Sequence, residues 1–403
     1  MKVKLIPLAI ACALTAQAQA GTVTSSGPDI IINTKSGFEV KTVDGDYKFK
    51  IGGRIQLDYN SYDGVMNKVE GETGSDLFFR RARIEMKGKI KDWGYLFSYN
   101  LTHSGSIDQL HTTYLGWGKT ARLTFGEQKE NFGLEDTGSS KWITAIERSL
   151  PASAFDTGNT LGVKLHGSTD LMTYNLGVSK SAIDDDDNSL DTAITGRFVI
   201  RPINTGDTLV HLGAGYTRRD GEFDEIGARL GIRGGDNKTA NKVKAEYNGG
   251  LMGDQLDVWN LEAAANLGSV HLMAEYFDGE VSGESGAPDL AADGYYVQAG
   301  WIVTGEQRKY KNKIAAFDKV KPKGANGAWE VFARYDSLDV TQSDNSPLVK
   351  LTAEESETLT LGVNWYVNSA VKVALNYVHA ETDTQINDED DGDALTARLQ
   401  IAF

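Results

Sequence analysis

The sequence predicts an all-β fold, a transmembrane antiparallel β-barrel of 16 strands. Most of the chain consists of segments of about ten residues in which apolar and polar side chains alternate. Successive side chains of a strand point to opposite faces, so each segment has one apolar and one polar face. In outer-membrane barrels the apolar face contacts lipid and the polar face lines the lumen. The two ends of the chain favour this barrel over other β folds.

The last segment, 393–403, shows the pattern most clearly. Leu395, Leu399, Ile401 and Phe403 fall on one face, and Arg398 lies on the other. A final strand that is apolar on one side and ends in Phe is typical of outer-membrane barrels.

The N-terminus carries an export signal. Lys2 and Lys4 precede an apolar run, and small residues at 18–20 form a cleavage site. Residues 1–20 are therefore predicted to be a signal peptide, too short to span a membrane. A lipoprotein anchored at Cys12 is a weaker alternative because the residues before it fit a lipidation site poorly. Cys12 is the only cysteine, so a mature chain would lack disulfides.

The predicted domains are the signal peptide, an N-terminal periplasmic segment at 21–46 and the barrel at 47–403. Tight turns alternate with longer polar loops, as in barrels whose short turns are periplasmic. The expected strands lie near 47–60, 76–91, 93–103, 108–117, 120–128, 160–168, 171–180, 192–201, 207–217, 256–267, 270–280, 293–304, 327–337, 356–367, 370–380 and 393–403.

Two connections fit this scheme less well. The segment 218–255 holds an extra strand-like piece near 228–233, and we assign it to a long loop. The segment 304–326 is long for a periplasmic turn and rich in lysine. It either guides anions at the pore exit or is a solvated turn, and the solvated turn is favoured.

Composition and motifs exclude several functions. The net charge of -15 argues against a nucleic-acid partner. The histidines are isolated, and zinc-ligand spacings and phosphate-binding or dinucleotide-binding loops are missing. We therefore expect no enzyme activity and no cofactor or metal. A secreted β-sandwich is a weaker alternative, because ten-residue strands with aromatic residues near their ends suit a membrane better.

The polar faces carry more cations than anions. Because rings of Arg or Lys select anions in pores, this excess predicts a preference for anions. Arg80 has the parity of the apolar face, so it either snorkels at the membrane rim or turns inward at a bulge. The inward cations are Lys48, Lys50, Arg54, Arg81, Arg83, Lys87, Lys89, Arg122, Lys164, Arg197, Arg334, Lys372 and Arg398, and the inward anions are Asp58, Glu85, Glu262, Glu275 and Glu330.

From about residue 38 to 403 the chain resembles the phosphate-selective porins of Gram-negative bacteria. The resemblance implies a 16-stranded trimeric barrel whose third outer loop folds inward and narrows the pore. Here that loop is 129–159. The matching motifs are 52–58 (GGRIQLD), 79–83 (FRRAR), 126–129 (GEQK), 132–135 (FGLE), 146–151 (IERSLP), 295–298 (YYVQ), 304–306 (TGE), 320–323 (VKPK) and 329–330 (WE).

The resemblance also implies site residues. Arg148 matches the IERSLP motif and is the expected constriction cation, and Arg81 and Arg83 match the wall motif. The residues predicted to line the pore are Arg148, Arg81, Arg83, Arg54, Arg122, Lys129, Lys87, Arg334 and Arg398.

We therefore expect an outer-membrane porin that passes small hydrophilic solutes and prefers anions, with phosphate or polyphosphate as candidate solutes. A non-selective porin of the same fold and a structural or adhesive barrel are the alternatives. The expected partners are small anions, the lipid bilayer and two further copies in a homotrimer.

Overall fold

The computed structural model describes residues 21–23, 29–34, 37–69, 71–102, 105–180, 192–234, 241–284, 286–386 and 389–403. The predicted signal peptide, 1–20, and the acidic run 184–187 lie outside the described residues. Within the described part, no helix is both long and apolar enough to cross a bilayer.

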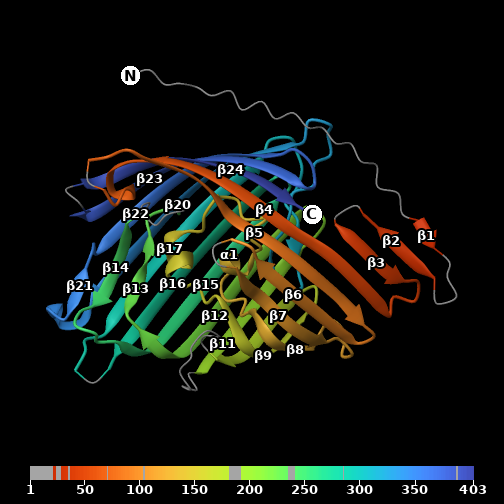
Figure 1. Cartoon of the computed structure of the whole chain (residues 1–403), viewed down its shortest axis with the longest axis horizontal. Coiled ribbons are helices and arrows are strands. Elements are labelled where there is room, and N and C mark those ends of the chain that lie inside the picture. The colour runs from red at the N-terminus through yellow and green to blue at the C-terminus, as the bar shows by residue number, and fades with distance from the viewer. Residues whose placement is uncertain are drawn as a thin grey trace.

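Sixteen of the described strands close into a single antiparallel barrel, as predicted (Figure 1). Each strand pairs with its neighbour in chain order, and the last strand, β24, pairs with the first barrel strand, β4. The barrel strands are β4 (Tyr47–Tyr62), β5 (Gly74–Ile90), β6 (Trp93–Asn100), β7 (Ser106–Tyr114), β8 (Arg122–Lys129), β9 (Asn159–Ser168), β10 (Met172–Lys180), β11 (Thr192–Asn204), β12 (Thr208–Phe223), β15 (Gly253–Leu267), β16 (Val270–Gly283), β17 (Leu290–Ile302), β20 (Ala328–Gln342), β22 (Glu355–Tyr366), β23 (Val371–Ile386) and β24 (Glu389–Ala402).

The two ends of the barrel differ in their connections. One end, called here the short-turn end, carries tight turns such as 91–92 and 268–269 and the C-terminus. The other, the long-loop end, carries the longer connections. The C-terminus is fixed by backbone pairing, because Gly53 N donates to Phe403 O at 2.8 Å and Phe403 N donates to Gly53 O at 3.2 Å. A Cβ at Gly53 would lie 2.4 Å from Arg83 O and 2.9 Å from the Phe403 ring, so this contact requires glycine.

The segment before the barrel forms a small sheet beside it. Strands β1 (Gly21–Val23), β2 (Ile30–Asn33) and β3 (Phe38–Thr42) pair antiparallel in order. β3 then pairs with the first residues of β4, beyond the point where β24 ends. The three strands extend away from the short-turn end (Figure 1, red). The described strands β1, β2 and β3 therefore pair locally and continue the wall along one edge of β4.

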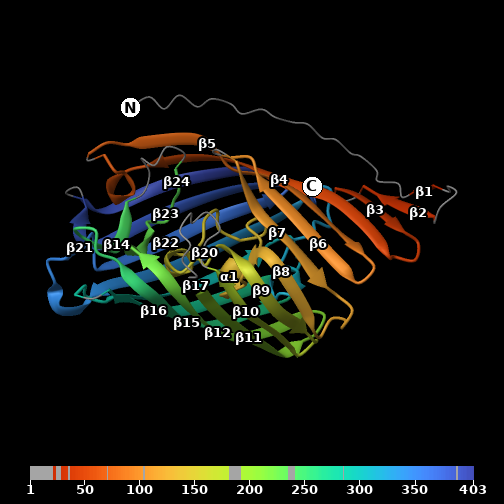
Figure 2. The ribbon, with the colours of Figure 1, turned by 60° about the horizontal axis from the view of Figure 1, so that its bottom comes forward.

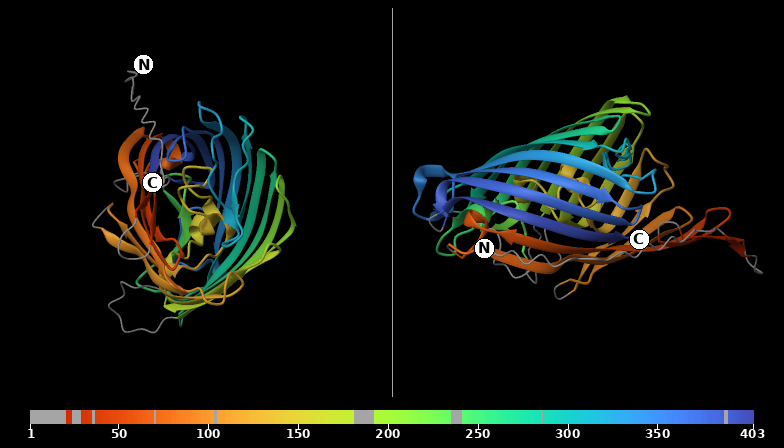
Figure 3. Two further views of the ribbon diagram at one scale, coloured as in Figure 1. Left: turned by 90° about the vertical axis from the view of Figure 1, so that its right-hand side faces the viewer. Right: turned by 90° about the horizontal axis from the view of Figure 1, so that it is seen from above.

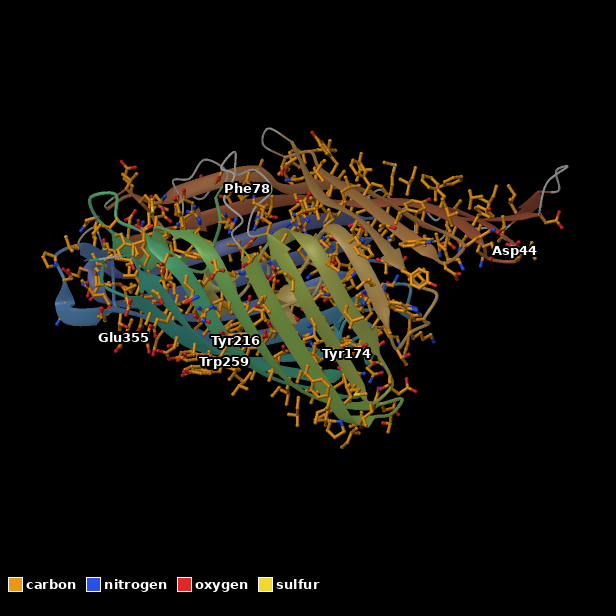
Figure 4. All side chains as sticks on the ribbon, turned by 90° about the horizontal axis from the view of Figure 1, so that it is seen from below. Asp44, Phe78, Tyr174, Tyr216, Trp259 and Glu355 are labelled. Atoms are coloured by element: carbon orange, nitrogen blue, oxygen red, sulfur yellow. The ribbon has the colours of Figure 1, made fainter. Side chains whose placement is uncertain are left out.

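Side chains on the outer surface form an apolar band bounded by aromatic rings. On β17, Val297 is 53% exposed and Trp301 is 52% exposed, whereas the inward Gln298 is buried. Near the short-turn end Trp329 and Trp365 stack at 5.3 Å. Tyr216 and Trp259 lie together on the outside of β12 and β15, with ring centroids 4.5 Å apart (Figure 4). Aromatic belts of this kind mark the two interfaces of a membrane.

Toward the long-loop end the polarity of the strands reverses. Inward positions there are aliphatic, and Leu290, Leu338 and Val340 are fully buried. Outward positions are acidic, and Asp293 stands opposite both Asp278 and Asp339 on the adjacent strands. Charged side chains are costly in hydrocarbon, so this part of the wall lies outside the apolar band.

A second sheet lies at the barrel mouth at the long-loop end (Figure 2). It contains β13 (Glu225–Arg229), β14 (Lys242–Tyr247) and β21 (Val349–Leu351). The strand-like piece expected near 228–233 overlaps β13, so it belongs to a loop, as predicted, and not to the barrel wall. Ile226, Val243 and Ala245 of this sheet pack against the aliphatic inner face of the wall.

Candidate solute path through the barrel

The third long connection, 130–158, folds into the lumen. It contains two short helices, α1 (Leu134–Thr137) and α2 (Leu150–Ala154), and lies inside the barrel (Figure 3, left). Its start is held by Glu275 of β16, which accepts from Leu134 N at 2.6 Å and from Glu135 N at 2.8 Å. Its end is held by Asp336 of β20, which accepts from Leu150 N at 2.9 Å. Wall carboxylates thus satisfy backbone donors at both helical turns.

Between these anchors the loop lies along the wall. Four polar side chains of three wall strands, β4, β22 and β24, donate to its backbone carbonyls, so the chain crosses the barrel without unpaired acceptors at these points. The donors are Gln56 to Ser140 O at 3.0 Å, Gln400 to Lys141 O at 3.0 Å, Asn364 to Thr144 O at 2.9 Å and Arg398 to Ile146 O at 2.7 Å. The loop therefore lies against β4, β24 and β22, and it also contacts β5.

Charged side chains of β4 and β5 meet the loop at one carboxylate, Glu85. Arg54 Nη2 lies 3.2 Å, Lys141 Nζ 3.2 Å and Lys87 Nζ 3.6 Å from its oxygens. Burial lowers the pKa of Lys141 to about 8, against the opposing effect of Glu85. Arg54, Lys87 and Lys141 therefore form one cationic group around a single anion.

Two bulges add charged residues to the inner surface. β4 and β5 slip by one residue between Gln56 and Leu57, which leaves Arg80 unpaired in the ladder. Arg80 turns inward and binds Glu147 of the loop at 2.8 and 3.0 Å. This settles the two alternatives for Arg80 in favour of the bulge.

The second bulge lies on β7, where the register slips between Ser98 and Tyr99 and Asp108 is the extra residue. Asp108 faces inward and pairs with Arg83 at 2.6 Å. Alternation does not predict an inward Asp108, because in an unbroken strand Asp108 would lie on the face opposite to Gln109.

Arg148 and Lys129 meet in a group of four charges on the loop. Asp136 Oδ1 lies 2.8 Å from Lys129 Nζ and 3.0 Å from Arg148 Nη2. Asp156 Oδ2 lies 3.3 Å from Arg148 Nη1. Burial lowers the pKa of Arg148, but Asp136, Asp156 and two further loop carboxylates outweigh it and raise the pKa overall. Arg148 is thus on the inward loop, but it is paired with both Asp136 and Asp156.

Arg334 and Arg398 are almost fully buried under the loop. Arg334 pairs with Asp336 at 2.9 Å, and Arg398 pairs with Asp58 at 2.6 Å. Both also donate to loop carbonyls, so they brace the loop against the wall. Asp336 shares the parity of Arg334, and alternation alone could have identified it as an inward residue.

Arg81 and Arg122 differ from the other predicted residues. Arg81 Nη1 donates to Gln56 Oε1 at 3.2 Å, and no carboxylate of the described residues lies within ion-pair distance of it. Arg122 lies near the short-turn end and donates to Gly118 O at 3.1 Å. These two guanidinium groups face the interior without a carboxylate partner in the described part of the chain.

The segment between β17 and β20 also folds into the lumen, from the short-turn end. Arg197 donates to Ile314 O and Ala315 O at 2.9 Å, and Asn266 donates to Arg308 O at 2.6 Å. Ala315 and Ala316 are completely buried. The favoured interpretation of 304–326 as a solvated turn was therefore wrong. Most of its lysines are nevertheless exposed.

The buried histidines belong to packing networks. His211 lies 3.0 Å from Glu262 and 2.6 Å from the Tyr310 hydroxyl, and His271 lies 2.6 Å from Glu330. The described residues contain no cluster of three His, Cys, Asp or Glu that could hold a metal ion. The described interior contains many arginines and lysines, and carboxylates pair with most of the arginines.

A family model described as phosphate-selective porin O and P matches residues 49–403. Porin O of Pseudomonas aeruginosa is 40% identical, over 98% of this chain and 97% of its own length. A second relative, an uncharacterised protein of Caulobacter vibrioides, is 26% identical over 73% of this chain and 62% of its own length.

Solved structures resemble the fold at low identity. OmpT of Vibrio cholerae matches with a TM-score of 0.56 and 12% identity, over 89% of this chain and 98% of OmpT. The anion-selective porin of Comamonas acidovorans matches with a TM-score of 0.56 and 12% identity, over 89% of this chain and all 100% of that porin. At this identity the likeness establishes the barrel architecture alone.

Proposed function

Because the chain belongs to the family of phosphate-selective porins O and P, we propose that it forms an anion-preferring channel for phosphate-containing solutes. It is a porin of the Gram-negative outer membrane, and porins are channels and not enzymes. The expectations of a porin barrel, an outer-membrane location and no enzyme activity are confirmed by this membership. The preferred solute and the residues that select it belong to the proposal.

One observation carries the proposed anion preference. Cations from the wall converge where the loop 130–158 narrows the lumen, and Arg81 there has no carboxylate partner among the described residues. A guanidinium group can donate two parallel hydrogen bonds to phosphate oxygens. Fixed cations in a narrow path raise the local anion concentration, an effect that salt weakens.

We also propose a homotrimer. One solved structure of the structurally similar OmpT of Vibrio cholerae is described as a trimer form, and the family resemblance implies the same state. Chemical cross-linking in native membranes would show a trimer band, and a monomer band alone would contradict the proposal.

Planar bilayers test the proposed function. Under a KCl gradient the reversal potential should show that chloride is more permeant than potassium. Added phosphate should block the chloride current. Arg81→Gln should weaken the phosphate block by about tenfold, since one charge-assisted pair is removed. Lys350→Gln is the matched loss of one cation, because Lys350 is an exposed residue of β21, in the sheet at the barrel mouth and away from the loop 130–158; it should leave the block unchanged. A wild-type channel without anion preference would contradict the proposal.

A non-selective porin is the second candidate, and one observation favours it. Arg54, Arg83, Arg148, Arg334 and Arg398 all lie within ion-pair distance of carboxylates. Their charge is then partly cancelled inside the barrel. Chloride conductance that is indifferent to phosphate would favour this candidate.

A further inference from the structure

Asp136 lies behind the two cations of the inward loop. Its side chain is 4% exposed, whereas those of Lys129 and Arg148 are 22% and 14% exposed. Oδ1 contacts both cations, at 2.8 and 3.0 Å. The two cations are therefore more accessible than the carboxylate, which lies buried between them and the rest of the loop.

The second oxygen of Asp136 is unusual. Oδ2 is buried and has no hydrogen-bond partner in the described residues. A buried carboxylate oxygen without a partner is costly, so local stability alone does not explain an aspartate here. Its attraction to Lys129 and Arg148 is the favourable interaction that keeps the carboxylate in place.

The charges of the group balance. Asp136 and Asp156 carry two negative charges against the positive charges of Lys129 and Arg148. An anion that reaches the exposed side of these cations must therefore compete with Asp136 for them. In a pore, conduction requires that a bound ion is held strongly enough to enter and weakly enough to leave.

We propose that Asp136 is a specificity-determining residue, an internal anion that weakens the grip of the loop cations on passing anions. The inference rests on the proposed function, since it assumes that the path takes anions. The recognised chemistry is an inorganic anion, with phosphate as the probe, and the residue acts through Lys129 and Arg148 and not by contact with the solute.

Asp136→Asn tests this inference, because it removes the charge and keeps the shape. The variant should show phosphate block at a concentration about tenfold lower than wild type, from loss of one nearby charge. Its reversal potential should move toward the equilibrium potential of chloride. Asp136→Glu keeps the charge and should behave like wild type. An unchanged block and an unchanged reversal potential in Asp136→Asn would overturn the inference.

Glu225→Gln is the matched control. Glu225 on β13 is likewise a carboxylate within ion-pair distance of two lysines, Lys242 and Lys244, but it belongs to the sheet in the mouth. It should leave the phosphate block unchanged. An equal shift in Glu225→Gln would attribute the effect to net charge and overturn the inference.

The two proposals fail in distinguishable ways. A wild-type channel without anion preference contradicts the proposed function. A wild-type channel that prefers anions, together with an Asp136→Asn variant of identical selectivity, contradicts this inference alone. If Asp136→Asn yields no channels, Asp136→Ser, which removes the same charge with a smaller side chain, gives a second test with the same outcomes.

Discussion

At the scale of single residues, alternation predicted which side chains face inward, but not which of them are paired. Arg54, Arg334 and Arg398 are inward, as their parity indicates, and they meet Glu85 of another strand, Glu135 of the loop and Glu147 of the loop, respectively. Those partners come from distant parts of the chain, so local pattern cannot identify them. Asp108 and Arg80 face inward through bulges, and a bulge shifts parity by one residue.

The pH dependence of selectivity is a residue-scale prediction. Burial raises the pKa of Asp136, whereas Arg148 and Lys129 hold the pKa of Asp156 at about 2 although burial opposes this. As the pH falls, Asp136 therefore becomes neutral first, and Lys129 and Arg148 then face Asp156 alone. A raised carboxyl pKa means that ionised Asp136 destabilises the fold at high pH, and that protonation relieves this.

We therefore expect the chloride-to-potassium permeability ratio to rise as the pH is lowered from neutral and Asp136 becomes protonated, above the ordinary range of an aspartate. Reversal potentials of wild type and Asp136→Asn measure it, because the variant should lack this component of the rise. The charged loop neighbours Glu135 and Glu147, which also act on Arg148, are present in both proteins. An equal rise of the permeability ratio with falling pH in both proteins would contradict the prediction.

At the scale of elements, the strands and their order followed from the sequence, but the conformations of the long connections did not. The segment 304–326 is rich in lysine and looks solvated. Its backbone carbonyls nevertheless accept hydrogen bonds from Arg197 and Asn266 inside the barrel. Those donors lie on β11 and β15, far away in the sequence, and lysine stems leave their charges in water while the backbone packs.

The anchoring of the inward loop gives an element-scale prediction. Glu275→Gln replaces a carboxylate that accepts two backbone N–H groups with an amide that has one acceptor oxygen. We expect the free energy of unfolding to fall by about 1–3 kcal/mol and the chloride conductance to become noisier. Denaturant titration in detergent and single-channel recording measure the two effects. The control is Glu280→Gln, an exposed position on the same strand, which should match wild type. A Glu275→Gln variant with the stability and the current noise of wild type would contradict the anchoring role of Glu275.

At the scale of the whole molecule, the reversal of polarity along the strands places the membrane. Val297 lies in the apolar band of β17, and Asp293 lies four positions toward the long-loop end, in the acidic zone. Four residues span about 13 Å along a strand, so the two positions should lie in different environments.

Site-specific labels test this placement. A fluorophore at Val297→Cys should be quenched by brominated lipid tails, because the side chain faces hydrocarbon. The same label at Asp293→Cys should be quenched weakly and should respond to a water-soluble quencher. Equal quenching by the lipid at both positions would contradict a membrane boundary between them. The sequence has one cysteine, Cys12, in the predicted signal peptide.

The two bulges have a consequence for how such a channel can change. Removing Arg80 would restore the regular ladder and leave Phe79 outside and Arg81 inside, and removing Asp108 would do the same for Ile107 and Gln109. A single-codon deletion at either position therefore alters the charge of the tunnel while every other side chain keeps its orientation. Length variation within strands, usually regarded as disruptive, is here a mild route by which related channels can acquire different electrical properties.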